Sequence, residues 1–256
     1  MEKSEKKEYF KTDEYEDFFS NWTKLYRTIK SYILNKDKDD IKWSIIFIFM
    51  TLQNLFILCL RQSNNFSITK GEAKLSYKNI KYTIIRVYNN IERYEINNVN
   101  SNEKKISIKD WYTLSSKEIQ NILEELGIDK KISEKKSKEI NEQFNYLCNF
   151  SELYKRVKLD DFMKMYVNSK PLKSVQEYDY SIKKINSFRN NFIHFAPQTW
   201  FIELSGINNI FCNCICIMEE LICETNMINT NYPIKEKWNE AIEQIKELKQ
   251  ELKLLL

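Results

Sequence analysis

Glycine and proline are scarce in this sequence, with three of each among 256 residues. A fold built from many short strands needs such residues at its turns, so their scarcity favours long helices over a turn-rich β fold. Histidine is scarcer still, because His194 is the only one. A zinc site that needs two imidazoles within one chain is therefore excluded.

The chain also lacks a strong excess of charge of one sign. It has 40 basic and 36 acidic residues, interleaved along its length, for a net charge of +4. This balance is weaker than the basic footprint that indicates nucleic-acid binding by itself, although it leaves room for a local basic groove. Hydrophobic residues make up 43% and aromatic residues 14% of the chain, which suffices for a packed core and excludes global disorder.

The cysteines show no metal-binding pattern. No Cys-x-x-Cys pair occurs, and on a helix Cys214 would point away from Cys212 and Cys216. We therefore predict no metal and no cofactor, and expect free, buried thiols. The first residues, Met1 to Lys7, are charged and do not resemble a secretory signal, so a cytoplasmic protein is expected. The six cysteines are Cys59, Cys148, Cys212, Cys214, Cys216 and Cys223.

Apolar residues recur every three or four positions over most of the chain, which predicts an all-α fold. The exception is 64–113, where alternating residues around Tyr82 and Ile84 indicate an irregular or partly β insertion. No repeat or linker divides the rest, so we predict one helical domain spanning 1–256, with 233–256 as its C-terminal helix. A capping box at Ser115 should begin a helix directly after the insertion.

The run from Trp43 to Leu60 has eighteen residues without a charge. That length is close to the minimum for crossing a bilayer. Polar residues in its middle, such as Gln53 and Asn54, argue against a span, and a helix that is apolar all round also suits the centre of a soluble bundle. We favour the buried helix and no membrane, with a membrane-attached protein as the alternative.

The stretch Ser187 to Trp200, SFRNNFIHFAPQTW, gathers the residues with most chemical capacity. Asn190 and His194 are four apart, so they share a helix face and the amide could orient the imidazole ring. Arg189 is about 140° round the helix from His194, so the two meet only at a groove edge or across two subunits. Pro197 should end the helix.

An arginine and a histidine separated by four residues, here Arg189 and His194, resemble the motif of the HEPN superfamily. The longer segment RNNFIHFAPQTWFIEL is similar to the corresponding segment in a bacterial branch of that superfamily. The resemblance covers, with gaps, about 41–60 and 144–223. It implies a HEPN-like helical bundle, RNA as substrate, and a homodimer in which two motifs form a composite active site. It also implies a toxin or antiviral defence effector.

The motif residues suit RNA cleavage without a metal. A histidine near its ordinary pKa accepts or donates a proton at neutral pH, and an arginine holds a phosphate with two parallel hydrogen bonds. The ribose 2′-hydroxyl would attack its own phosphodiester and leave a 2′,3′-cyclic phosphate. The sequence thus predicts a metal-independent endoribonuclease with Arg189, His194 and Asn190 as catalytic residues.

Each of these residues also has a purely structural alternative. His194 could be a satisfied core histidine, and Arg189 could form an ion pair with Glu203 or Asp179. The corresponding alternative function is a catalytically inactive HEPN-like module that binds RNA or protein and dimerises.

Further residues around the motif are candidate RNA contacts. Lys183 and Lys184 precede Arg189 on the same helix and could contact phosphates, and Trp200 could stack on a base. Their structural alternatives are exposed, solvating lysines and a buried tryptophan anchor. Two places after the histidine, where related toxins commonly carry a modifiable tyrosine, this chain has Ala196. A neutralising or activating partner protein would therefore have to act by another route.

Overall fold

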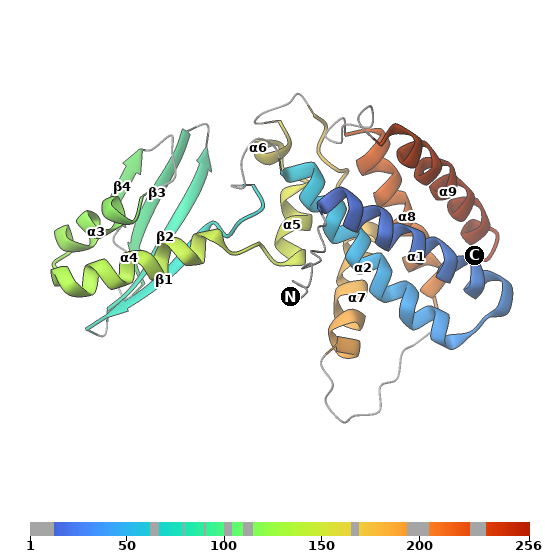
Figure 1. Ribbon diagram of the computed structural model, residues 1–256, viewed down its shortest axis with the longest axis horizontal. Helices are drawn as coiled ribbons and strands as arrows, with labels where there is room; N and C mark the ends of the chain where they lie inside the picture. The colour runs from blue at the N-terminus through green and yellow to red at the C-terminus, as the bar shows by residue number, and fades with distance from the viewer. Residues whose placement is uncertain are drawn as a thin grey trace, which may run out of the picture.

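The computed structural model describes residues 13–61, 67–78, 80–89, 91–99, 104–109, 115–164, 169–193, 205–225 and 234–256. Helices predominate, with one sheet between the second and third of them (Figure 1). In chain order the elements are α1 Glu14–Asn35, α2 Lys38–Leu60, β1 Glu72–Tyr77, β2 Ile80–Asn89, β3 Ile91–Asn98, β4 Lys104–Lys109, α3 Ser116–Glu125, α4 Lys130–Asn145, α5 Phe150–Arg156, α6 Asp160–Met163, α7 Gln176–Ile193, α8 Ile207–Cys223 and α9 Lys235–Lys253.

The larger hydrophobic core lies among α1, α2, α5, α6, α7, α8 and α9. α2 contacts five of these helices, namely α1, α5, α6, α7 and α8. Among the described residues, α2 is the one helix long and apolar enough to cross a membrane, and 61% of its apolar window is buried in the fold. Its central position agrees with the interpretation of 43–60 as the buried helix of a bundle.

The apolar faces of α1 and α9 pack against each other. α1 begins at the cap residue Asp13, whose carboxylate accepts hydrogen bonds from two backbone N–H groups of the first turn. Trp238 of α9 is fully buried and stacks on Phe18 at a centroid distance of 4.9 Å. The indole N–H of Trp22 donates to Gln244 (2.8 Å), so this large side chain is buried without losing its hydrogen bond.

The four described strands form an antiparallel sheet in the order β1-β2-β3-β4. α3 and α4 pack on it and form a second hydrophobic core with it. The predicted capping box is present, since Ser115 and Glu118 exchange side-chain and backbone hydrogen bonds at the start of α3. Gly127 follows α3 with a φ of 80°, a left-handed conformation that glycine adopts without strain. The core consists of Ala73, Leu75, Tyr82, Ile84, Ile119, Leu123, Ile128, Ile140 and Phe144.

The mostly helical prediction is confirmed, and the insertion is more regular than expected. The described strands within 64–113 form one four-stranded antiparallel meander, where an irregular or partly β insertion was expected. Ile140 and Phe144 of α4 are buried against this sheet and not in the larger bundle. The described residues contain two separate hydrophobic clusters. The assignment of 1–256 to one domain stays a prediction.

All six cysteines are free thiols. Four of them are buried, as expected from their apolar surroundings, and burial raises the pKa of Cys59 to about 12. Cys223 is exposed and Cys216 partly so, which corrects the expectation that all six thiols are buried. On α8, Cys212 and Cys214 are buried, and Cys214 is fully so.

Candidate active site

α7 carries the motif, and its buried face fixes how the motif is presented. Ile182 and Ile185 are buried in the larger core. Arg189 is one turn beyond Ile185 on the same side of the helix, so it emerges at the edge of the core and is partly buried. α7 begins at Gln176, and the carbonyl of Val175 accepts its first hydrogen bonds, from the backbone N–H groups of Tyr178 and Asp179.

Arg189 is held by an aromatic ring and an amide. Its guanidinium carbon lies 4.5 Å from the centroid of the Phe49 ring on α2, a cation–π contact. Its Nη1 donates a hydrogen bond to Oδ1 of Asn190 (3.0 Å). Its Nε is buried and has no hydrogen-bond partner among the described residues. The guanidinium is therefore oriented while part of its donor capacity remains unused.

This guanidinium lines a cleft of about 450 Å³ between α2, α5 and α7. Arg189 is the only charged side chain among the described lining residues. The aromatic part of the wall is rigid, because Phe49 and Phe150 stack at a centroid distance of 4.3 Å. A cation among amides without a carboxylate suits an anion. The lining residues are Phe49, Gln53, Asn149, Phe150, Ser151, Asn186, Arg189 and Asn190.

Polar contacts tie the α5 and α7 walls together. The Asp179 carboxylate of α7 accepts hydrogen bonds from Lys158 (2.6 Å) and from the Tyr154 hydroxyl (2.7 Å). These two donors, Lys158 foremost, lower the pKa of Asp179. The alternative ion pair between Asp179 and Arg189 is therefore not the one that forms. Glu203, the other suggested partner, lies outside the described residues.

The cleft brings together only some of the predicted site residues. Arg189 and Asn190 are adjacent in it, and Oδ1 of Asn190 accepts a hydrogen bond from the guanidinium, a contact that helical spacing does not predict. His194 and Trp200 lie outside the described residues, so the predicted contact between Asn190 and the imidazole stays a prediction.

Neither predicted lysine is among the described residues that line the cleft. Lys183 is exposed, and the ammonium group of Lys184 lies over the Tyr180 and Phe188 rings at 5.5 and 6.0 Å. Both lysines are nevertheless on the helix that carries Arg189.

Several lining residues were missed from the sequence. Asn186 precedes Arg189 by three residues, so helical spacing alone could have placed it on the same face. Phe49 and Gln53 are likewise four apart on α2, but nothing local shows that this face of α2 meets α7. Asn149 and Ser151 come from the start of α5, and only the tertiary fold brings them to the cleft.

Potential metal ligands do not gather in the described part of the chain, where no three histidine, cysteine or acidic side chains stand close enough to hold an ion. The prediction of metal-free chemistry stays a prediction, because His194 is not among those residues. Comparisons of the chain with family models, with curated proteins and with solved structures each found no match.

Proposed function

We propose that the protein is a metal-independent endoribonuclease that works as a homodimer, with Arg189 and His194 as its catalytic residues and Asn190 as the residue that positions Arg189. The observation that carries the proposal is the Arg189 guanidinium, oriented by Phe49 and Asn190 in an amide-lined cleft where no described carboxylate neutralises it. The resemblance of RNNFIHFAPQTWFIEL to the HEPN motif supports RNA as the substrate.

His194 is close to Arg189 in the covalent chain. It follows Ile193, the last described residue of α7, and consecutive Cα atoms are only about 3.8 Å apart. Ile193 in turn is one helical turn beyond Arg189. The only histidine of the protein is thus next to the helix end that carries the unneutralised guanidinium.

Each group has a defined step in the reaction. His194 of one copy removes the proton from the ribose 2′-hydroxyl, whose oxygen attacks the adjacent phosphorus. The bond from phosphorus to the 5′-oxygen breaks, and His194 of the second copy gives that oxygen its proton. Arg189 offsets the negative charge that grows on the phosphoryl oxygens. The products are a 2′,3′-cyclic phosphate and a 5′-hydroxyl, so protons and bonds balance without a metal.

The test compares wild type with His194→Ala on mixed RNAs in EDTA, with the new ends mapped. The wild type should cleave and leave cyclic phosphate ends, and the variant should be slower by roughly 10²–10⁴-fold, the usual contribution of a general acid or base. Equal cleavage by both proteins, or loss of wild-type cleavage in EDTA, would contradict the proposal. RNA binding without any cleavage would instead support the inactive HEPN-like binding and dimerisation module.

The resemblance also supports a biological role as a cytoplasmic toxin or antiviral effector. Expression of the wild type in a bacterial host should then arrest growth and degrade cellular RNA, while equal amounts of the His194→Ala protein should do neither. Growth arrest by both proteins would separate the toxicity from the nuclease.

A further inference from the structure

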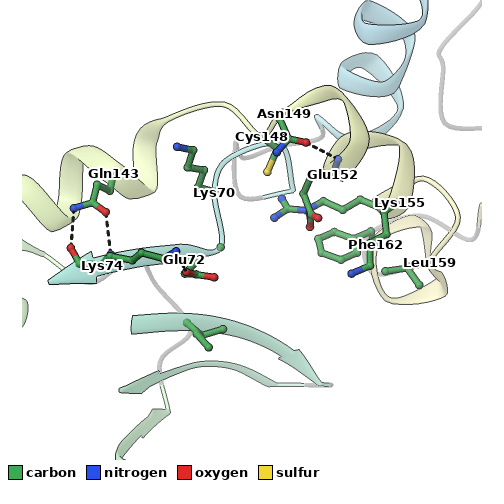
Figure 2. Close-up of a pocket in the computed structure, with 13 residues that line it drawn as sticks. Lys70, Glu72, Lys74, Gln143, Cys148, Asn149, Glu152, Lys155, Leu159 and Phe162 are labelled. Carbon is green, nitrogen blue, oxygen red and sulfur yellow. Dashed lines mark hydrogen bonds and ion pairs between the residues drawn. The ribbon is translucent and has the colours of Figure 1, made fainter. Parts of the chain in front are cut away.

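A second, larger groove lies where the sheet meets the helical bundle. It has a volume of about 660 Å³, within the range of ligand-binding sites. Figure 2 shows Glu72 and Lys74 on β1 and Lys70 just before it on one side, with Lys155 of α5 on the other side. The remaining wall comes from β2, α4 and α6 through Ile85, Gln143 and Phe162.

The groove carries an excess of positive charge. Two of its cations are matched by carboxylates, since Lys74 pairs with Glu72 (3.2 Å) and Arg156 with Glu152 (3.1 Å). Lys70 and Lys155 also line the groove, are exposed, and form no ion pair with any described residue, although the ammonium group of Lys70 lies over the Tyr146 ring at 5.3 Å. A ring contact leaves the charge of an ammonium group in place, so two ammonium groups without a carboxylate partner, on opposite walls, are suited to contact an anion that runs between them.

The floor of the groove is rigid. The Arg156 side chain is 3% exposed, and its Nη1 donates to the carbonyl oxygens of Ser67 (2.8 Å) and Thr69 (2.9 Å). These bonds fix the chain that enters the sheet against α5. The backbone N–H of Cys148 adds a bond to the carbonyl of Ile68 (2.8 Å). The two lysines are therefore presented by elements that are tied to each other.

The groove and the Arg189 cleft share a wall. Asn149 lines both, and α5 separates them, with Ser151 on the cleft side and Lys155 on the groove side. Oδ1 of Asn149 caps α5 by accepting from the N–H of Glu152 (2.9 Å), so its amide NH₂ group remains as a donor at the point where the two spaces meet.

We propose that the groove holds the sugar-phosphate backbone of the same single-stranded RNA whose scissile phosphate is bound at Arg189, with Lys70 and Lys155 contacting phosphates flanking the cleavage site. The inference rests on the proposed function, because it identifies the substrate as a strand that extends beyond the cleft. It also gives the sheet a role, since the sheet supplies one wall of the substrate path.

The binding test uses the His194→Ala protein as background, so that the RNA stays intact. The double variant Lys70→Glu/Lys155→Glu is compared with Lys130→Glu/Lys131→Glu, an equal charge change at two exposed lysines at the start of α4. The affinity for a fluorescent RNA of about 12 nucleotides is measured by anisotropy at several salt concentrations.

The groove variant should bind at least tenfold more weakly, and its salt slope should fall by about 1.4, the value for two lost single-strand phosphate contacts. The control should stay within twofold of its parent. Unchanged affinity of the groove variant, or equal loss in both variants, would overturn the inference.

A cleavage assay in the His194-containing protein separates this inference from the nuclease proposal. The groove variant should raise KM for the long RNA and cleave a dinucleotide as fast as wild type does. If wild type cleaves RNA and the groove variant has an unchanged KM for the long RNA, the role of the groove is contradicted but the nuclease proposal is not. Absence of any wild-type cleavage, with the anisotropy result intact, would overturn the nuclease and support the groove as an RNA-binding site.

Discussion

The guanidinium of Arg189 stacks over the ring of Phe49, which in turn stacks on Phe150. A guanidinium offers its face to an aromatic ring and its edge to a phosphate, so the two contacts do not compete. Phe49 therefore sets the plane in which Arg189 presents its hydrogen-bond donors to the cleft.

Phe49→Leu should weaken substrate binding without unfolding the protein. The substitution keeps an apolar side chain in the core but removes the ring beneath the guanidinium, a contact of about 1 kcal/mol. KM for RNA is therefore expected to rise by about fivefold in steady-state cleavage assays.

Phe56→Leu is the matched control. Phe56 is fully buried and also contacts Phe150, at 5.4 Å, and no contact between its ring and Arg189 is found. Both variants should lower the melting temperature to a similar degree, but only Phe49→Leu should raise KM. An equal rise in both would mean that general loosening of the core explains the effect.

Substitutions of Asn190 distinguish its contact with Arg189 from the predicted contact with His194. Asn190→Ala removes the acceptor that orients the guanidinium, and about a tenfold loss of kcat/KM is expected, corresponding to about 1.4 kcal/mol. Asn190→Asp places a carboxylate beside the guanidinium and neutralises it, so the loss of activity should be larger although stability should not fall.

The opposite order would contradict this role for Asn190. A carboxylate can orient an imidazole as well as an amide does. Activity that is higher in Asn190→Asp than in Asn190→Ala would therefore indicate that Asn190 acts on His194.

The helices were predictable because their signals are local. The Ser115 capping box marked a true helix start, and the C-terminal helix predicted over 233–256 is present as α9. The sheet was only partly visible, because its strands are defined by pairing between segments and not by residue type alone. The two-core arrangement depends on which face of α4 meets the sheet, and helical periodicity cannot identify the partner.

The site was predictable only within α7. The adjacency of Arg189 and Asn190 follows from the sequence, but the ring of Phe49 comes from a helix 140 positions earlier, through long-range packing. The groove at Lys70 and Lys155 was equally unpredictable from the sequence, because one wall comes from the sheet and the other from the helical bundle. The net charge of +4 does not indicate this groove, because it does not show where two lysines without a carboxylate partner lie.

Asp179→Asn should reduce stability in a pH-dependent way. The pKa of Asp179 is lowered from its ordinary value, chiefly by the hydrogen bond from Lys158. A lowered carboxyl pKa means that the carboxylate stabilises the fold above the ordinary pKa and that this contribution is lost as pH falls through the folded-state pKa. The side chain is half exposed, so a loss of only about 1 kcal/mol is expected at pH 7.

Urea unfolding of wild type and Asp179→Asn at neutral pH and near pH 3 measures this effect. The difference in free energy of unfolding should be present at neutral pH and should shrink in acid. A difference that is the same at both pH values would show that the carboxylate charge does not contribute.

Lys183 should matter more for RNA binding than Lys184. Lys183 is three and seven residues before Asn186 and Asn190, which places it on the stripe of α7 that lines the cleft. Lys184 is two and six residues before the same asparagines, so it lies on a different side of α7, where its ammonium group is over the Tyr180 and Phe188 rings. In the His194→Ala background, Lys183→Ala should lower the salt slope for single-stranded RNA by about 0.7, and Lys184→Ala should leave it unchanged. Equal slopes in both variants would contradict this assignment.

The most direct test of the nuclease mechanism is cleavage of an RNA that carries a single 2′-deoxynucleotide at a mapped cleavage position. In EDTA, wild type should fail at that position alone and should cut the neighbouring sites to leave 2′,3′-cyclic phosphates, because the missing 2′-hydroxyl is the nucleophile. Cleavage at the deoxy position, or new ends that carry a 3′-hydroxyl, would contradict the account.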